Sequence, residues 1–207
     1  MLIAQVDGLQ LRSGEVCGDA RLNPRVLQSP TKIELRVEKN GRRIQGAKVW
    51  IRASGSPGTW IQTQSDADGR VETYVAAACV DAVCFHPEAA VLVANGLTTG
   101  GTLSLSSGPI LEVGLANAST VDKSELSVVL VPENDIVAGI ESREFSVRLD
   151  HLKVGETRYV SVPTSGGFRV EAQRSYDEAR RGVWLAVPLR IDVKGTEADL
   201  LIEIIPR

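Results

Sequence analysis

Short runs of alternating apolar and polar residues, each ended by a turn signal, recur along the whole chain. In the run 32–39, Ile33, Leu35 and Val37 share one face and charged residues occupy the other, as a half-buried strand requires. Asn40-Gly41 follows, and this dipeptide favours a tight hairpin because both central residues of a type I′ turn adopt positive φ. A chain built from such runs folds into sheets.

The turn signals recur about every 8–12 residues, a spacing that is typical of a sandwich or a barrel. The best helix candidate, 176–181, is too short for more than about two turns. The continuous apolar run 89–94 predicts a central strand. We therefore expect an all-β protein, made of two tandem antiparallel β-sandwich domains of the Ig-like type.

The domain division follows from the length of 207 residues, since a sandwich of this type needs about 100. A polar stretch of small residues near 117–120 separates two strand-rich blocks. We predict a first sandwich with an N-terminal extension over 1–118 and a second sandwich over 119–207. A single sandwich with insertions is the alternative.

The stretch 31–75 combines a strand, the Asn40-Gly41 turn, a strand that carries Gly46-Ala47, and an aspartate-glycine turn at 66–69. In this order the features resemble a bacterial Ig-like or carboxypeptidase-regulatory-like (transthyretin-type) β-sandwich module, over about residues 31–115. The resemblance implies a spacer, an adhesive stalk or an assembly domain. It provides no catalytic residue to transfer, and fold analogy does not establish function.

Composition excludes several classes of function. Aromatic residues make up only 4% of the chain and the formal net charge is −3, so a nucleic-acid-binding or anionic-membrane-binding surface is not expected. No run approaches the roughly 20 apolar residues of a membrane helix. No nucleophile elbow and no phosphate-binding loop occur. We predict that the protein is not an enzyme and needs no cofactor.

The cysteines and one histidine form the most specific local cluster. Cys79, Cys84 and His86 lie close in sequence, and with Cys17 they provide three thiolates and an imidazole, a set that suits tetrahedral zinc. A disulfide between Cys79 and Cys84 is the second interpretation. Reduced, buried thiols that pack as small apolar groups are the third.

Asp66 and Asp68 stand at alternate positions before Gly69, as carboxylates in a calcium loop do. The EF-hand pattern would then place its first and twelfth ligands at Gln64 and Val75, which do not fit. The competing interpretation is a hairpin turn in which an aspartate caps backbone N–H groups and the glycine adopts positive φ.

We therefore predict a structural or adhesive assembly protein. Its partner would be another protein or a second copy, bound through exposed sheet edges. One alternative is a module that binds carbohydrate or a surface ligand on Trp50, Trp60 or Trp184. Another is a hydrolase that uses paired carboxylates. For nucleophilic catalysis, His86 and His151 are the only candidate imidazole bases, and no flanking pattern singles out either of them. The chain shows no signal peptide, so we expect a cytoplasmic protein or a surface protein whose leader has been removed.

Overall fold

The computed structural model describes residues 3–6, 9–12, 30–117, 126–153, 155–174, 184–187, 190–194 and 197–206. The regular elements of these residues are β-strands and one short 3-10 helix, η1 (Ser142–Phe145). The all-β prediction is therefore confirmed. Two strands near the N-terminus, β1 (Ile3–Val6) and β2 (Leu9–Arg12), pair with each other in a small sheet of their own.

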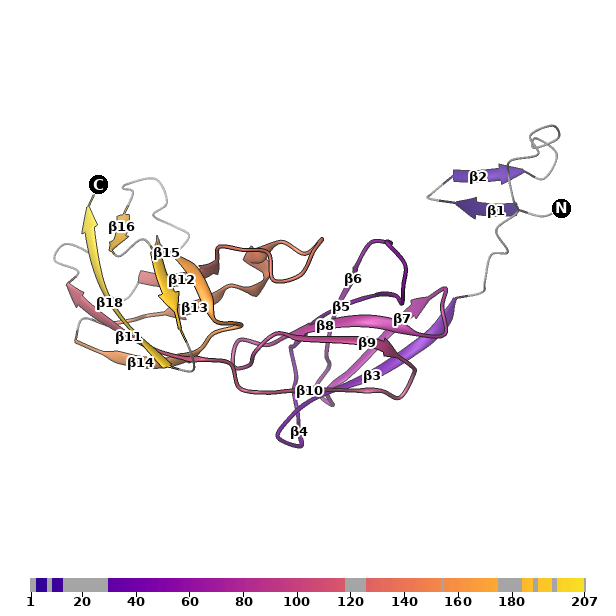
Figure 1. The fold of residues 1–207 in the computed structure, drawn as a ribbon, viewed down its shortest axis with the longest axis horizontal. Helices are drawn as coiled ribbons and strands as arrows, with labels where there is room; N and C mark the ends of the chain where they lie inside the picture. The colour runs from indigo at the N-terminus through magenta and orange to yellow at the C-terminus, as the bar shows by residue number, and fades with distance from the viewer. Residues whose placement is uncertain are drawn as a thin grey trace.

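The strands β3 to β10 form two sheets, which we call the first lobe (Figure 1). One sheet has the order β10-β3-β7, with β4 beside β3, and the other has the order β6-β5-β8-β9. The strands are β3 (Thr31–Lys39), β4 (Arg42–Arg43), β5 (Lys48–Ala53), β6 (Ile61–Gln64), β7 (Arg70–Val75), β8 (Val80–Phe85), β9 (Leu92–Leu97) and β10 (Thr102–Leu105).

The strands β11 to β18 form two further sheets, the second lobe, with the orders β14-β11-β18-β16 and β13-β12-β15-β17. The strands are β11 (Ile110–Asn117), β12 (Leu126–Pro132), β13 (Val147–Asp150), β14 (Thr157–Ser161), β15 (Gly166–Arg174), β16 (Trp184–Val187), β17 (Arg190–Val193) and β18 (Glu197–Pro206).

The two lobes share one strand topology. When the two-residue strand β4 is left out of the count, the first strand of each lobe pairs antiparallel with the fourth and parallel with the last, as β3 does with β7 and β10, and β11 with β14 and β18. In each lobe the second strand lies between the third and the fifth, as β5 lies between β6 and β8, and β12 between β13 and β15. The chain therefore repeats one core arrangement of strands, in which each lobe adds one parallel pair to its antiparallel ladders. The second lobe has in addition the strand β16 beside β18, and the first lobe has the short β4 beside β3.

The division into domains at 118/119 stays a prediction, because residues 118–125 lie outside the described part of the chain. The prediction assigned β11 to the first domain, whereas β11 pairs with β14 and β18 of the second lobe. The run 89–94 does not form a central strand, because β9 begins at Leu92 and lies at the edge of its sheet. The central position belongs to β8 instead.

The alternation of apolar residues in β3 produces the core of the first lobe. Ile33, Leu35 and Val37 are buried, and the residues between them are exposed or half-buried. The Asn40-Gly41 turn has φ values of 53° and 74°, as predicted for a hairpin whose central residues need positive φ. Local turn chemistry and the two-residue period therefore set the register of this sheet.

Gly69 illustrates how tightly a turn packs against this core. Its φ is +69°, and a Cβ built on it would lie 2.6 Å from the Val37 carbonyl oxygen. The Val37 amide donates to the Gly69 carbonyl at 2.7 Å, so the two backbones cannot separate without losing a hydrogen bond. Gly55 has the same φ of +69°, but nothing lies within 4 Å of its missing Cβ.

We expect Gly69→Ala to lower the free energy of unfolding by more than about 2 kcal/mol, because it adds a steric clash to the cost of a left-handed alanine. Gly55→Ala is the matched control and should cost about 1 kcal/mol. Urea unfolding of both variants measures the difference. Equal losses would show that the contact with Val37 adds nothing.

Candidate functional site

The central strands β5 and β8 are buried on both faces, which is unusual for a two-layer sandwich. Every residue of β8 is buried. Because side chains alternate along a strand, the two strands present one set of apolar residues to the core of the first lobe and another set to the opposite side. The first set is Val49, Ile51, Val80, Ala82 and Cys84, and the second is Trp50, Val83 and Phe85.

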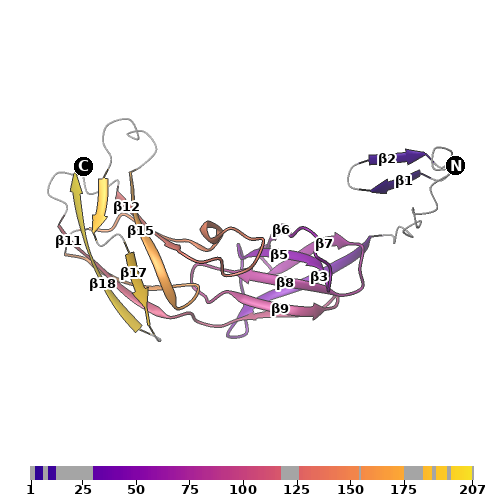
Figure 2. The same ribbon diagram turned by 45° about the horizontal axis from the view of Figure 1, so that its top comes forward.

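The second set packs against the second lobe. Trp50, Val83 and Phe85 belong to one apolar cluster with the core residues of β11, β12, β13 and β15. We call this contact the joint. Figure 2 shows the segment between β12 and β13 reaching across from the second lobe over β5 and β8. The joint therefore merges the outer face of a first-lobe sheet with the core of the second lobe.

Phe145 lies at the centre of the joint. Its ring centroid is 5.2 Å from that of Trp50 in a tilted arrangement, and 5.7 Å from that of Phe85 in an edge-to-face arrangement. Both geometries are favourable for aromatic pairs. Phe145 is fully buried at the end of η1, so the short helix serves to place this side chain between the two lobes.

Trp60 extends the joint toward the loop before β6. Its indole N–H donates to the Ala138 carbonyl at 3.2 Å, and the ring lies against Gly139. The Arg52 guanidinium lies 4.2 Å from the ring centroid in a cation–π contact. Trp60 therefore contacts residues of both lobes. Trp50 is buried, with only 3% of its surface exposed to solvent. The side chain of Trp184 lies outside the described part of the structure, so the predicted ligand platform has no support from the other two tryptophans.

The polar contact at the rim contributes little energy. Lys48 Nζ lies 2.8 Å from Glu144 Oε2, and the two side chains are 42% and 38% exposed. An ion pair this exposed stabilises by about 0–1 kcal/mol. The aromatic and aliphatic burial therefore dominates the stability of the joint, and the ion pair helps to fix its orientation.

Asp81 anchors the polar end of β8 beside the joint. The Ser54 hydroxyl donates to Asp81 Oδ1 at 2.8 Å, the Gly96 amide donates to the same oxygen at 3.3 Å, and Arg52 Nε lies 3.6 Å from Oδ2. The hydrogen bond from Ser54, together with those from the amides and the nearby guanidinium, holds the pKa of Asp81 below its ordinary value, although burial opposes this shift. Asp81 therefore orients Arg52 over Trp60.

The structure separates the predicted cysteine and histidine cluster. Cys84 faces the core of the first lobe, and burial raises the pKa of its thiol to about 12. Cys79 is an exposed free thiol at the other end of β8. His86 Nδ1 accepts a hydrogen bond from the Glu88 amide at 3.3 Å. Cys17 lies outside the described residues. Within the described part of the chain, no group of three or more His, Cys, Asp and Glu side chains is placed to hold a metal ion.

The candidate Cys79–Cys84 disulfide requires correction, because both residues are free cysteines in the structure. An extended strand separates them, and five residues of strand span about 16 Å. A disulfide needs Cα atoms about 4.4–6.8 Å apart. The sequence interpretation missed that the residues between the cysteines form a central strand rather than a loop.

The aspartates of the candidate calcium loop are used within the protein. Asp66 Oδ1 accepts hydrogen bonds from the amides of Asp68 and Arg70 at 2.9 and 2.8 Å. Asp68 Oδ1 accepts one from Arg43 Nη1 at 3.1 Å. This arrangement is the capped hairpin turn that was the alternative interpretation. The calcium site itself stays a prediction.

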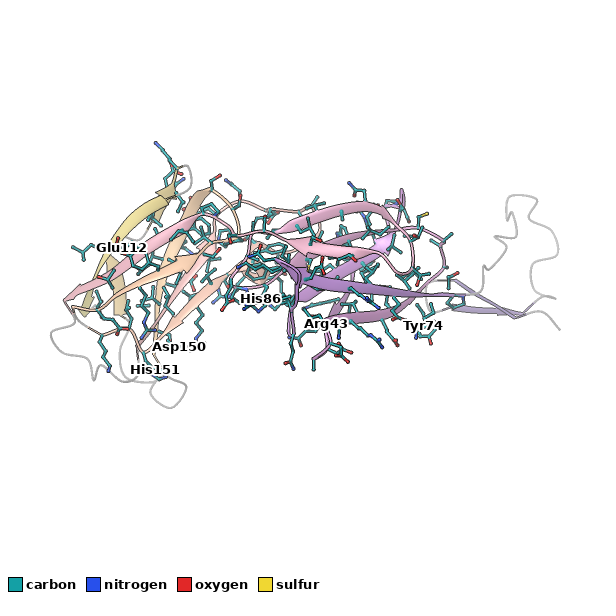
Figure 3. The ribbon with its side chains drawn as sticks, turned by 90° about the horizontal axis from the view of Figure 1, so that it is seen from below. Arg43, Tyr74, His86, Glu112, Asp150 and His151 are labelled. Carbon is teal, nitrogen blue, oxygen red and sulfur yellow. The ribbon has the colours of Figure 1, made fainter. Side chains whose placement is uncertain are left out.

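The two candidate imidazole bases lie in different lobes, His86 after β8 and His151 after β13 (Figure 3). Ser127 and Asp150 lie next to His151, but the Ser127 hydroxyl donates to Asp150 Oδ1 and accepts from Arg148 Nη2. The hydrogen bond from Ser127, followed by the one that Arg148 Nε donates to Asp150 Oδ1 at 2.6 Å, lowers the pKa of Asp150. A serine nucleophile must instead donate to its base. This cluster is therefore arranged as an ion-pair network.

In the second lobe, the sheet β13-β12-β15-β17 corresponds to the sheet β6-β5-β8-β9 of the first lobe, but its outer face is different. Val129 of its central strand lies between Arg148 and Glu171 in the ladders. Exposed ion pairs cover this face: Arg148–Asp150, Arg143–Glu171, Arg169–Glu171 and Arg190–Glu133. The outer face of this sheet is therefore charged at its surface, with Val129 and Val131 of β12 buried among the ion pairs, whereas the corresponding face in the first lobe carries Trp50, Val83 and Phe85.

No protein-family profile matches the sequence. No curated protein is similar to it either. No helix in the part of the chain that the structure describes could cross a bilayer.

Solved structures give only distant likenesses. The Bacillus anthracis TIE protein is 10% identical with a TM-score of 0.29, over 85% of this chain and 34% of its own. A streptococcal ancillary pilin is 10% identical with a TM-score of 0.30, over 86% of this chain and 63% of its own. The D295N mutant of the shaft pilin SpaA of Lactobacillus rhamnosus GG is 8% identical with a TM-score of 0.31, over 86% and 98%. At these scores the likenesses establish neither a family nor a function.

We expect the contribution of Asp81 to depend on pH. Its folded pKa is lowered, so the stabilisation is present above the unfolded value of about 3.9 and is lost as the pH falls through the folded value. Asp81→Asn should therefore lower the melting temperature at pH 7 and have a much smaller effect near pH 2. Melting curves of both proteins over this range measure the effect. A difference that is constant with pH would contradict the role of the carboxylate.

Proposed function

We propose that the protein is a non-enzymatic structural or assembly component, which holds two β-sandwich modules in one fixed orientation for contact with other proteins. We further propose that the boundary between the modules lies between β10 and β11, because each set of strands then completes the same topology. The proposal rests on the joint. It does not rest on the distant structural likenesses.

The joint carries the proposal because it uses large side chains to connect the modules. Trp50, Phe85 and Phe145 each bury an aromatic ring between the lobes. Burial of one such side chain stabilises by about 1.5–3 kcal/mol. A connection between independent modules needs no apolar contact, since relative motion is the default between domains. A fixed orientation is the property that a spacer or an assembly subunit needs.

The polar contacts around the joint favour the same interpretation. Trp60 donates to the backbone of the β12–β13 connection, and Lys48 pairs with Glu144 of the same connection. In addition, the Val91 amide donates to the Pro163 carbonyl at 2.9 Å across the two lobes. These contacts lie at separate points around the aromatic cluster, so they restrict rotation of one lobe about the other.

Small-angle scattering on the dilute full-length protein tests the proposal. We expect one rigid arrangement of the lobes to fit the wild-type curve. Phe145→Ser removes the central ring, so its curve should need a mixture of orientations and give a larger radius of gyration. Tyr159→Ser, at an aromatic side chain that is 70% exposed, is the control and should match the wild type. A wild-type curve that itself needs a mixture of orientations would contradict the proposal.

A further inference from the structure

The strand β6 is an edge of the sheet β6-β5-β8-β9, and it is unusually unprotected. Its sequence Ile61-Gln62-Thr63-Gln64 has no ionisable side chain and no proline. Ile61 is 42% exposed at the rim of the sandwich. Its pairing with β5 is regular from Ile61 to Gln64, without a bulge. Natural edges are normally protected against further pairing by charge, proline or a bulge.

Most of the other edge strands with described side chains carry such protection. The edge strands β7, β13, β14 and β17 each contain charged residues. The edge strand β9 is uncharged, but its pairing is interrupted by a bulge near Gly96, whose φ is +68°. In β10, Ser104 donates to the carboxylate of Glu38 on the neighbouring strand. Among the edge strands with described side chains, β6 and β10 therefore both lack charge, proline and a bulge, and of these two β6 carries the self-complementary side chains Gln62 and Gln64.

We propose that β6 pairs antiparallel with β6 of a second copy of this chain, about a two-fold axis at Thr63. This inference deepens the proposed function and rests on it, because it names the partner and the edge through which the modules assemble. The pairing would join the two sheets into one continuous sheet, as in other complexes formed by strand addition.

The backbone geometry selects the register. The Ser65 amide donates to the Ala47 carbonyl, so Ser65 faces β5. In an antiparallel ladder the residues that face the neighbouring strand alternate, which leaves the N–H and C=O groups of Gln62 and Gln64 facing outward. With the axis at Thr63, Gln62 of one copy meets Gln64 of the other, and these outward groups satisfy one another.

The side chains fit a second copy in this register. Thr63 meets Thr63 of the second copy at the axis, and threonine pairs are favourable across a ladder. The side-chain amides of Gln62 and Gln64 each combine donors and an acceptor, so they are self-complementary. Gln64 Nε2 donates to the Gly46 carbonyl at 2.9 Å, which leaves its second N–H and its Oε1 for the second copy. Asp66 lies opposite Trp60 and Asp68 opposite Gly58, so no two charges of the same sign meet. A charged edge strand would meet its own charge in such a pairing.

The expected contact is small, because only a four-residue strand pairs. Interfaces below about 1,200 Å² are weak and transient. The association should therefore appear only at high protein concentration, or where many copies are held close together. A weak contact of this size allows β6 to pair at high concentration without causing aggregation in dilute solution.

Sedimentation velocity over a concentration series tests the pairing. We expect the sedimentation coefficient of the wild type to rise with concentration. The double variant Gln62→Lys with Gln64→Lys places lysines opposite lysines, so its coefficient should stay constant. An equimolar mixture of this variant with Gln62→Glu and Gln64→Glu places lysine opposite glutamate and should restore the rise.

Val93→Lys is the control, because it adds a positive charge to the uncharged edge strand β9, where Val93 is 51% exposed. It should associate as the wild type does. The proposal is overturned if the lysine double variant associates like the wild type, if Val93→Lys abolishes association, or if the wild type stays monomeric at every concentration. The scattering experiment in dilute solution tests the fixed orientation of the lobes separately, so the two proposals can fail independently.

Discussion

The contact of Trp50 and Phe85 with Phe145 is the interaction on which the arrangement of this molecule depends. A two-layer sandwich buries one face of each sheet and exposes the other to water. In the first lobe, the sheet β6-β5-β8-β9 instead buries both faces of its central strands. An apolar outer face of this kind must be covered, and the β12–β13 connection of the second lobe covers it.

The two lobes can be compared strand by strand, because their core strands are arranged in the same way. Both lobes share a core order of strands and the same parallel pair between first and last strand, although the second lobe adds β16 beside β18. What differs is the outer face of one sheet, which carries Trp50, Val83 and Phe85 in the first lobe and ion pairs such as Arg169–Glu171 in the second. The first lobe therefore joins the second through aromatic side chains, whereas ion pairs surround the buried Val129 and Val131 on the corresponding face of the second lobe.

The sequence predicted the features that depend on neighbouring residues. The alternation around Leu35 gives the buried face of β3, and the turns at Asn40-Gly41 and Asp66–Gly69 follow from side chains that adopt or cap positive φ. The sequence did not predict the strand β8, because a strand buried on both faces has no two-residue period. The cysteines Cys79 and Cys84 instead suggested a small loop closed by a disulfide. Its run of apolar residues from Val80 to Phe85, broken only by Asp81, was the available signal.

The joint could not be predicted from the sequence, because it brings together residues about half the chain apart. The contact of Phe145 with Trp50 depends on the placement of both sheets, and the N-terminus of η1 has no side-chain capping hydrogen bond that would mark it locally. The sequence predicted only that exposed sheet edges in general could bind a partner, and it did not single out the edge strand β6. Its position became clear once the bulge in β9 and the charges of the other edge strands had been placed.

Calorimetry of thermal unfolding tests the central claim most directly, because lobes that share an apolar core must lose it together. We expect the wild type to unfold in a single transition, with equal calorimetric and van't Hoff enthalpies. Two separate transitions in the wild-type protein, each with the enthalpy of one sandwich, would contradict the claim that the joint couples the two lobes.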